Sequence, residues 1–233
     1  MNSILLQKYR PLRVSFVDDC SEDDTVINFA KYAQELANSD IQVDYSRNVK
    51  RMFYGNCLKI AHDMSKEGFF GCLDADDALM PDAISTVMEK YISNPQIGHI
   101  YTQFMSCDQN LNPIRKGFSS CPPAGGSMLS EGRDNKHCYS HFRTFSSRVP
   151  RLEKVWAKDM RCAVDKYMGY RLEELSEGIY IDKPCYLWRG GRKGSISLTE
   201  PSRSQWNKVM LDARKRRSIW KIKPFPITKC KYQ

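Results

Sequence analysis

The 233-residue sequence has no C-x-x-C pair, although it contains nine cysteines. An odd number of scattered cysteines without that spacing argues against both a disulfide framework and a zinc ribbon. We therefore expect most of the cysteines to be reduced and buried. The nearest approach to a zinc-ligand cluster is the stretch HCYSH, with His137, Cys138 and His141, and no second cluster accompanies it.

Long apolar runs are also absent. No stretch approaches the roughly 20 apolar residues that a membrane-spanning helix needs. The start, MNSILLQKYRPLR, lacks the basic and then apolar layout of a secretory signal. Neither a P-loop nor a G-x-G-x-x-G motif occurs, and there is no internal repeat. These absences predict a cytoplasmic protein that is not built around a glycine-rich phosphate loop.

The composition is that of an ordinary globular domain, with 41% hydrophobic and 27% charged residues. The excess positive charge lies at one end. Residues 203–233 hold ten Lys and Arg and one acidic residue, whereas the first 202 residues hold 26 basic and 26 acidic residues. We expect a folded domain over residues 1–200 and a basic C-terminal helix and tail over residues 201–233.

Short apolar strands alternate with amphipathic helices along the chain. The predicted strands are 14–17, 41–46, 68–73, 97–108 and 179–191, and the predicted helices are 21–40, 52–65, 79–95, 165–178 and 205–220. This alternation predicts an α/β fold with a mostly parallel central sheet covered by helices on both faces. Ligands of such sheets bind beyond the carboxyl ends of the strands, where the acidic stretches 18–19 and 74–77 would lie.

Two details refine this picture. Pro184 inside the last predicted strand is typical of an edge strand. Residues 108–136 are rich in Gly, Pro, Ser and Asn and have no sustained period. They predict a long surface loop, and long loops on compact domains are often functional.

The stretch GCLDADD places Asp74, Asp76 and Asp77 within four positions at the end of an apolar run. Neighbouring carboxylates repel one another, and a divalent cation shared with a substrate diphosphate would offset that repulsion. The alternative is that Asp76 and Asp77 only precede a helix, where negative charge suits the N-terminal end of the helix dipole. The cluster by itself leaves both interpretations open.

Several segments, in order, resemble glycosyltransferase family 2, whose members have the GT-A fold and use nucleotide-sugar donors. The segments are VSFVDDCSEDDT, YGNCLKIAHDM, GFFGCLDADDALMPDAI, AVDKYMGYRLEE and YLWRGGRKGSIS. In the family they contribute an Asp-Asp-x-Ser turn, an Asn-containing helix, an Asp-x-Asp metal turn, a late acidic motif and a closing Tyr/Trp-Arg…Ser stretch. The resemblance extends over residues 3–198.

The resemblance implies roles in donor binding. Asp18 and Asp19 would lie near the uracil and ribose, with Arg51 near the base or the phosphates. Asp74 would face the sugar or the ribose. Arg189 and Arg192 would neutralise the leaving diphosphate through charge-assisted hydrogen bonds, the alternative being solvated surface arginines.

The resemblance also implies a Mn²⁺ or Mg²⁺ site and a general base. Asp76 would be the main metal ligand, and Asp77 would reach a metal-bound water. His141 would be a further metal or phosphate contact, unless it is a histidine packed on the sheet. Asp165 would take a proton from an acceptor hydroxyl, unless it only stabilises a helix N-terminus.

The sequence departs from the family at its start. The family opens with a β-strand and a Pro-x-Tyr-Asn-like turn that contacts the nucleotide base, followed by a helix. Here SILLQKY matches the end of that helix, so we expect an N-terminally reduced GT-A fold. Loss of a central strand would weaken base recognition and expose sheet edges, for which contacts in a homo-oligomer could compensate.

These features predict a metal-dependent, inverting hexosyltransferase that moves a sugar from a UDP-sugar to a saccharide, lipid-linked or protein acceptor. One alternative is a catalytically weak remnant that binds nucleotides or polyanions. Its basic helix would then attach to nucleic acid or to an anionic membrane surface. A lesser alternative is a nucleotidylyltransferase, which shares sheet topology and acidic metal sites but for which we would expect a glycine-rich phosphate loop and a lysine near the N-terminus.

Overall fold

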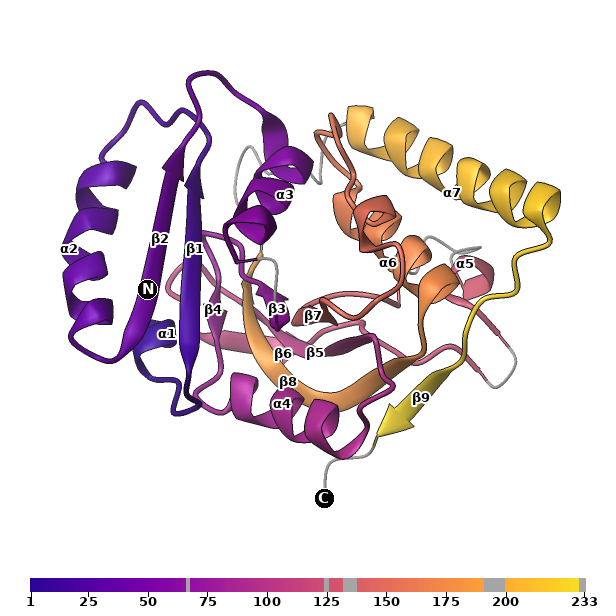
Figure 1. The fold of residues 1–233 in the computed structure, drawn as a ribbon, viewed down its shortest axis with the longest axis horizontal. Helices are drawn as coiled ribbons and strands as arrows, with labels where there is room; N and C mark the ends of the chain where they lie inside the picture. The colour runs from indigo at the N-terminus through magenta and orange to yellow at the C-terminus, as the bar shows by residue number, and fades with distance from the viewer. Residues whose placement is uncertain (66–67, 124–125, 132–137, 191–199, 231–233) are drawn as a thin grey trace.

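The computed structural model describes residues 1–65, 68–123, 126–131, 138–190 and 200–230 (Figure 1). Its helices are α1 (Asn2–Leu5), α2 (Thr25–Ala37), α3 (Phe53–Ser65), α4 (Ala83–Ser93), α5 (Met128–Glu131), α6 (Val164–Leu175) and α7 (Glu200–Trp220). Its strands are β1 (Leu12–Asp18), β2 (Ile41–Arg47), β3 (Phe69–Cys72), β4 (Ala78–Leu79), β5 (His99–Cys107), β6 (Pro113–Lys116), β7 (Arg143–Ser146), β8 (Gly178–Arg189) and β9 (Ile227–Cys230). Every strand and helix expected from the periodicity is present, with boundaries that differ by a few residues.

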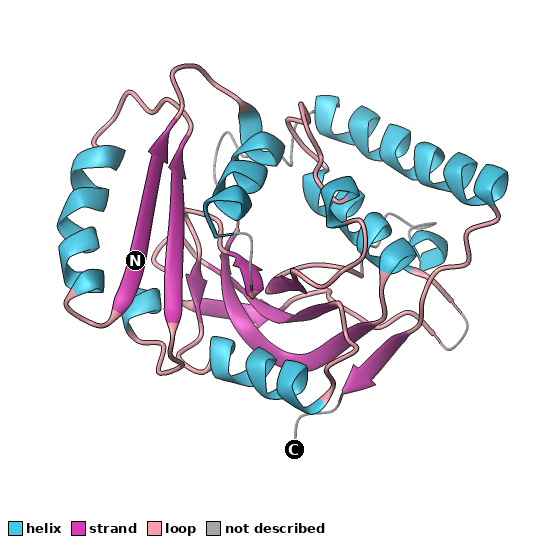
Figure 2. Ribbon diagram, viewed as in Figure 1, coloured by secondary structure: helices cyan, strands magenta, loops and turns pink. Residues whose placement is uncertain are grey.

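The strands form two sheets (Figure 2). β1 and β2 pair in parallel as a separate sheet. The larger sheet has the order β3-β7-β5-β8-β4, with β6 added to β5 and β9 added to β8. The α/β class is confirmed, but the expectation of a mostly parallel central sheet was wrong. In the larger sheet β5·β8 and β8·β9 are parallel, whereas the other four pairs are antiparallel: β3·β7, β5·β7, β4·β8 and β5·β6. Short connections such as the turn from β5 to β6 permit antiparallel pairing, which helix–strand alternation does not reveal.

Helices cover both faces of the larger sheet, as predicted. Side chains alternate along a strand, so neighbouring residues of β5 enter different cores. Ile100 joins a core with Val87 and Tyr91 of α4, and Tyr101 joins the core that α6 and α7 cover. Both β5 side chains are fully buried.

Pro184 lies in an interior strand, so the expectation of an edge strand was wrong. β8 has β5 on one side and both β4 and β9 on the other. Opposite Pro184, the register between β5 and β8 shifts on both sides of Gln103. A bulge of this kind removes the need for the N–H that proline lacks.

Residues 108–136 are not one long surface loop. They contain β6, which pairs with β5, and α5, in which Met128 and Leu129 are buried. Glu173 of α6 accepts a hydrogen bond of 2.7 Å from the backbone N–H of Met128. Both elements have only four residues, too few to show a hydrophobic period in the sequence. Residues 124–125 and 132–137 of this range lie outside the described residues.

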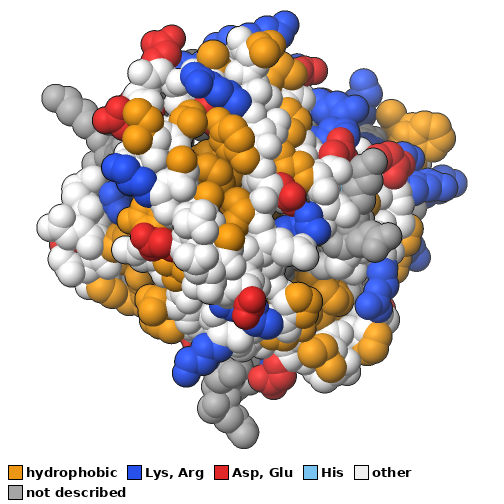
Figure 3. Space-filling model, turned by 60° about the vertical axis from the view of Figure 1, so that its left-hand side comes forward, with side chains coloured by type: hydrophobic (Ala, Val, Ile, Leu, Met, Phe, Trp, Pro, Cys, Tyr) orange, Lys and Arg blue, Asp and Glu red, His pale blue; other side chains and the backbone are white. Residues whose placement is uncertain are grey.

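Each sheet has a strand whose outer edge is unpaired among the described residues. Within the described residues, no strand pairs with the edge of β1 that faces away from β2, nor with the edge of β3 opposite β7. Gly71 of β3 is accordingly exposed. On the outer side of the smaller sheet, an open groove of about 380 Å³ lies between α2 and β2. Phe29, Ala33 and Tyr45 are among the residues that line it. Figure 3 turns this side forward, and hydrophobic side chains gather on it.

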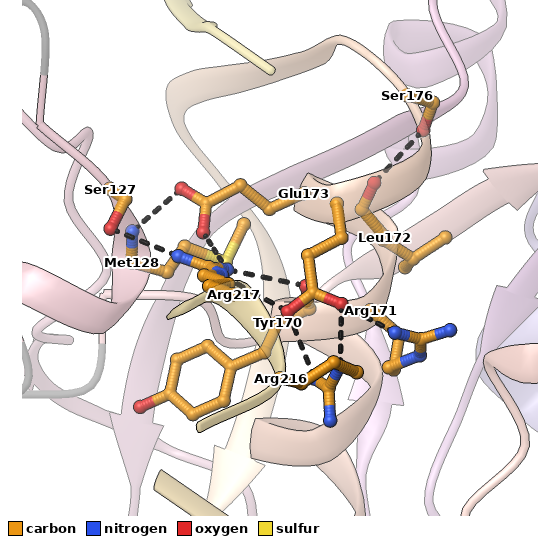
Figure 4. Close-up of polar contacts among 10 residues, drawn as sticks. Ser127, Met128, Tyr170, Arg171, Leu172, Glu173, Ser176, Arg216 and Arg217 are labelled. Atoms are coloured by element: carbon orange, nitrogen blue, oxygen red, sulfur yellow. Dashed lines mark hydrogen bonds and ion pairs between the residues drawn. The ribbon is translucent and has the colours of Figure 1, made fainter. Parts of the chain in front are cut away.

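The basic C-terminal segment is attached to the domain on both sides. Val209 and Ala213 of α7 are buried in the core that α6 shares, and β9 adds a strand to the larger sheet. Buried carboxylates of α6 hold two arginines of α7 (Figure 4). Arg217 forms ion pairs of 2.8 Å with Glu173 and 3.0 Å with Glu174, and Arg216 approaches Glu174 to 2.9 Å.

Replacing Glu174 with alanine should lower the free energy of unfolding by about 3 kcal/mol, because it leaves buried arginine charge without its partner. The Glu174 side chain is only 1% exposed and meets Arg171, Arg216 and Arg217. Urea denaturation followed by circular dichroism would measure the loss. Glu89→Ala, at a side chain that is 58% exposed on α4, is the control and should change stability by less than about 0.5 kcal/mol. Equal effects of the two substitutions would contradict the prediction.

Candidate functional site

The turn that follows β3 carries the acidic residues of the site. The backbone N–H of Asp77 bonds to the carbonyl oxygen of Asp74 at 3.1 Å, so the two residues lie one turn apart. Tyr186 of β8 links them, because its hydroxyl donates to Asp77 at 2.9 Å and accepts from the backbone N–H of Asp74 at 3.0 Å. The backbone N–H of Arg189 donates to the other oxygen of Asp77 at 2.8 Å.

His141 lies against the same tyrosine. Its ring stacks on Tyr186, with centroids 4.4 Å apart, and Phe104 meets it edge to face at 5.7 Å. One ligand atom each from Asp74, Asp77 and His141 lie within 4.8 Å of one another. Two carboxylates and an imidazole suit a divalent cation such as Mn²⁺, so these residues fit the predicted metal.

Burial raises the pKa of Asp77 to about 7. The hydrogen bonds from Arg189 and Tyr186 favour the charged form but do not outweigh burial, and the nearby charges of Asp74 and Asp76 add to the rise. The surroundings of Asp77 thus disfavour its charged form, mainly through burial. A cation at this position would stabilise that form.

Arg143 of β7 joins the acidic turn to the predicted base. Its guanidinium is buried and lies 3.5 Å from Asp74 and 3.9 Å from Asp165. It also donates to the hydroxyl of Tyr54 at 3.3 Å, while that hydroxyl donates to Asp74 at 2.6 Å. Burial acts to lower the pKa of Arg143, but the charges of its neighbours outweigh burial and raise it.

Asp165 lies in the first turn of α6, after Ala163 in a left-handed conformation. Its side chain is 30% exposed, so it is accessible from solvent. One guanidinium thus approaches both Asp165 and Asp74, so the predicted base and the acidic turn lie on either side of Arg143. The two readings of Asp165, as a base and as a helix N-terminal carboxylate, are therefore compatible.

Asp18 and Asp19 hold the loops at the ends of β1 and β2. Asp18 is buried, accepts from the N–H of Ser21 at 3.0 Å and lies 3.0 Å from Arg47. Asp19 accepts from the N–H groups of Met52 and Phe53 at 2.7 and 2.9 Å, at the start of α3. Burial acts to raise the pKa of Asp19, but these bonds and one from Asn48 outweigh it and lower the pKa.

The first turn of α3 brings the two acidic stretches together. Phe53 donates its backbone N–H to Asp19, and the next residue, Tyr54, reaches Asp74. Gly55 follows, and a Cβ at that position would lie 1.9 Å from the carbonyl oxygen of Ala157. Only glycine allows α3 to approach the segment before α6 this closely.

The remaining predicted residues are placed less centrally. Arg51 is exposed in the loop before α3. The Nε of Arg189 is buried without a hydrogen-bond partner among the described residues. Arg192 lies outside the described residues. Asp76 is half-buried beside Asp77 but is not part of the three-residue group, so its role as main metal ligand stays a prediction.

Sequence reasoning missed Tyr54, Arg143 and Tyr186. Arg143 stands two residues after His141, in HFR, and Tyr186 begins the stretch YLWRGGRKGSIS. Both therefore lay inside or beside segments that were already singled out. Tyr54 likewise begins the quoted stretch YGNCLKIAHDM, but its role depends on Asp74, 20 residues away, and not on the local pattern.

The sequence pattern of Glycosyl transferase family 2 matches residues 1–152, which is well over half of the chain. The chain belongs to glycosyltransferase family 2. Among curated members, the chondroitin synthase of Escherichia coli is 27% identical over 229 residues, which are 98% of this chain and 32% of that protein. The hyaluronan synthase of Pasteurella multocida is 27% identical over 130 residues, which are 54% of this chain and 12% of that protein. The family 2 chain thus spans at most about a third of the length of these relatives.

Solved structures support the fold of this family 2 chain. TarS of S. aureus superposes with a TM-score of 0.60 and 14% identity, covering 93% of this chain and 40% of TarS. The mannosyltransferase PcManGT of Pyrobaculum calidifontis, in complex with GDP-Man and Mn²⁺, also superposes with a TM-score of 0.60 and 14% identity. That match covers 92% of this chain and 59% of PcManGT. The predicted GT-A fold is therefore confirmed. Among the described residues of this chain, no helix is both long and apolar enough to cross a bilayer.

Substitutions in the acidic turn test whether Asp76, favoured by the sequence, or Asp77, favoured by the structure, contributes more to metal binding. Because Asp77 shares the group with Asp74 and His141, Asp77→Ala should weaken Mn²⁺ binding at least tenfold, about 1.4 kcal/mol. Isothermal titration of the protein with Mn²⁺ would measure the affinity. Asp76→Ala should have the smaller effect, and Asp23→Ala, at an exposed acid before α2, should have none. A larger loss with Asp76→Ala than with Asp77→Ala would favour the ranking from the sequence.

Proposed function

We propose that this chain transfers a hexose from a UDP-sugar to an acceptor hydroxyl with inversion, using Mn²⁺ or Mg²⁺. One observation carries the proposal: Asp74, Asp77 and His141 lie close enough to share a cation, and Arg143 links Asp74 to Asp165. The proposal places the donor diphosphate at these metal ligands and the acceptor hydroxyl at Asp165, on the two sides of Arg143. The family assignment supports sugar transfer over the nucleotidylyltransferase alternative.

In this proposal Asp74, Asp77 and His141 hold the cation, which would stabilise negative charge on the departing diphosphate. Tyr186 and the backbone N–H of Arg189 fix the orientation of the Asp77 carboxylate. The guanidinium of Arg189, together with Arg192, adds positive charge for the diphosphate. Asp76 is the alternative ligand, as the resemblance implied.

Asp165 acts on the acceptor side. It would accept the proton of the acceptor hydroxyl as the oxygen forms its bond to the anomeric carbon and the diphosphate leaves from the opposite face. Arg143, at 3.9 Å, holds the Asp165 carboxylate in position. A single base acting on the acceptor in this way gives inversion of the anomeric configuration.

The relatives support a saccharide acceptor. The curated relatives are synthases of chondroitin and hyaluronan, and one structural neighbour was solved with a nucleotide sugar and Mn²⁺. We therefore propose a growing polysaccharide as the acceptor. Asp18, Asp19 and Arg51 would lie near the uracil and ribose, at the loops where β1 ends and α3 begins.

Binding of UDP should depend on the cation. Without Mn²⁺ the acidic turn repels the diphosphate, so we expect at least tenfold tighter UDP binding with Mn²⁺ than without, about 1.4 kcal/mol. Calorimetric titration on the wild type and on Asp77→Ala would measure it, with GDP as the control nucleotide. Equal affinity with and without Mn²⁺ would reject the metal site. Salt-sensitive binding of DNA or liposomes by a protein that binds neither UDP nor Mn²⁺ would favour the polyanion-binding remnant.

Replacing Asp165 with asparagine should remove the base while keeping its shape. We expect a loss of roughly 100-fold or more in kcat for transfer or donor hydrolysis, with UDP affinity changed less than threefold. Release of UDP from a panel of UDP-hexoses, with chondroitin and hyaluronan oligosaccharides as acceptors, would measure the rate. Asp159→Asn, in the segment before α6, is the matched control. A rate within threefold of the wild type would exclude Asp165 as the base.

A further inference from the structure

The C-terminal end of α7 and the segment after it form an exposed surface that the sugar-transfer site does not use. Three large hydrophobic side chains lie in solvent there, with Trp220 exposed by 73%, Ile219 by 59% and Phe225 by 42%. The exposed basic residues of the same segment are Arg214, Lys215, Lys221 and Lys223. We call these seven residues the α7 tip. A tryptophan this exposed is unusual on a soluble domain.

The α7 tip is held in place at both ends, so its exposure does not come from a frayed terminus. On one side, Arg216 and Arg217 are bound to Glu173 and Glu174 of α6 (Figure 4). On the other, the backbone N–H of Phe225 donates to the carbonyl oxygen of Glu173 at 2.7 Å, and β9 then pairs with β8. The hydrophobic side chains are thus presented from a fixed support.

The charge of the α7 tip is of one sign. No acidic residue follows Asp212 in the sequence. Glu173 and Glu174 compensate Arg216 and Arg217, and within the described part of the chain none of the four basic residues of the tip forms an ion pair. Its positive charge is therefore available to an external partner.

We propose that the α7 tip docks the protein on an anionic membrane surface. Trp220, Ile219 and Phe225 would enter the headgroup region, where amphipathic aromatic rings are stable, and the four cations would meet anionic lipid headgroups. A nucleic acid would match the cations but would give aliphatic Ile219 no counterpart, so the membrane is favoured. The inference does not depend on the proposed sugar transfer.

Co-sedimentation of the whole chain with vesicles tests the proposal. Vesicles with about 30% phosphatidylglycerol in phosphatidylcholine should bind the protein at about 0.1 M salt, and pure phosphatidylcholine should bind it much more weakly. Trp220→Ala should lower the partition coefficient about tenfold, since it removes the aromatic side chain that would insert among the headgroups. Lys221→Ala combined with Lys223→Ala should lower it about 25-fold, roughly fivefold for each cation.

Matched controls separate the tip from general surface effects. Ile92→Ala, at a residue exposed by 66% on α4, and the pair Lys8→Ala and Lys31→Ala, both exposed elsewhere, should change partitioning less than twofold. Thermal melts should be unchanged for all variants, because none of these side chains is buried.

Three results would overturn the proposal. The first is no binding to the anionic vesicles, and the second is binding that Trp220→Ala weakens no more than Ile92→Ala. The third applies to a protein that does not bind the vesicles: either it forms a dimer in solution that Trp220→Ala dissociates, or it binds DNA and the Lys221→Ala and Lys223→Ala pair reduces that binding. The tip would then serve a protein or nucleic-acid contact instead.

Discussion

The buried guanidinium of Arg143 is the interaction on which the site depends. Asp74 belongs to the turn after β3 and Asp165 to the first turn of α6, and no backbone hydrogen bond joins those two segments in the described part of the chain. Arg143, on β7 between them, approaches both carboxylates. A buried cation requires negative partners, and Asp74 and Asp165 supply them. Each group thereby fixes the position of the others, and the site exists only when β3, β7 and α6 are in place.

The start of α3 plays the corresponding part for the smaller sheet. Since β1 does not pair with β3, the position of the β1 loop relative to the acidic turn comes from side chains. Asp19 binds the N–H groups at the start of α3, and Tyr54 in the same turn binds Asp74. Gly55 then lets α3 contact the backbone at Ala157. Hydrogen bonds at one helix terminus thus replace the strand pairing that would otherwise join the two sheets.

The sequence predicted the elements because periodicity is a local property. The runs around Val14 and Ile100 are short and rich in β-forming residues, and the stretch from Val26 to Leu36 repeats at helical spacing, so their assignment needed no partner. Pairing is not local. β8 became an interior strand although Pro184 suggested an edge, because a bulge opposite Gln103 absorbs the missing N–H. Residues 113–116 became a strand only because β5 offers them an edge.

For the acidic turn as well, the sequence determined one part of the site and the tertiary structure another. The spacing of Asp74, Asp76 and Asp77 showed that three carboxylates lie close enough to repel one another, and by itself it left a cation site and a helix N-terminus open. Which of them face a common point was decided by the tertiary structure. Tyr186 and the N–H of Arg189, more than 100 residues away in the chain, orient Asp77 toward Asp74 and His141. The residue types are fixed by the sequence, whereas the directions of their side chains depend on hydrogen bonds from strands that only the folded chain brings together.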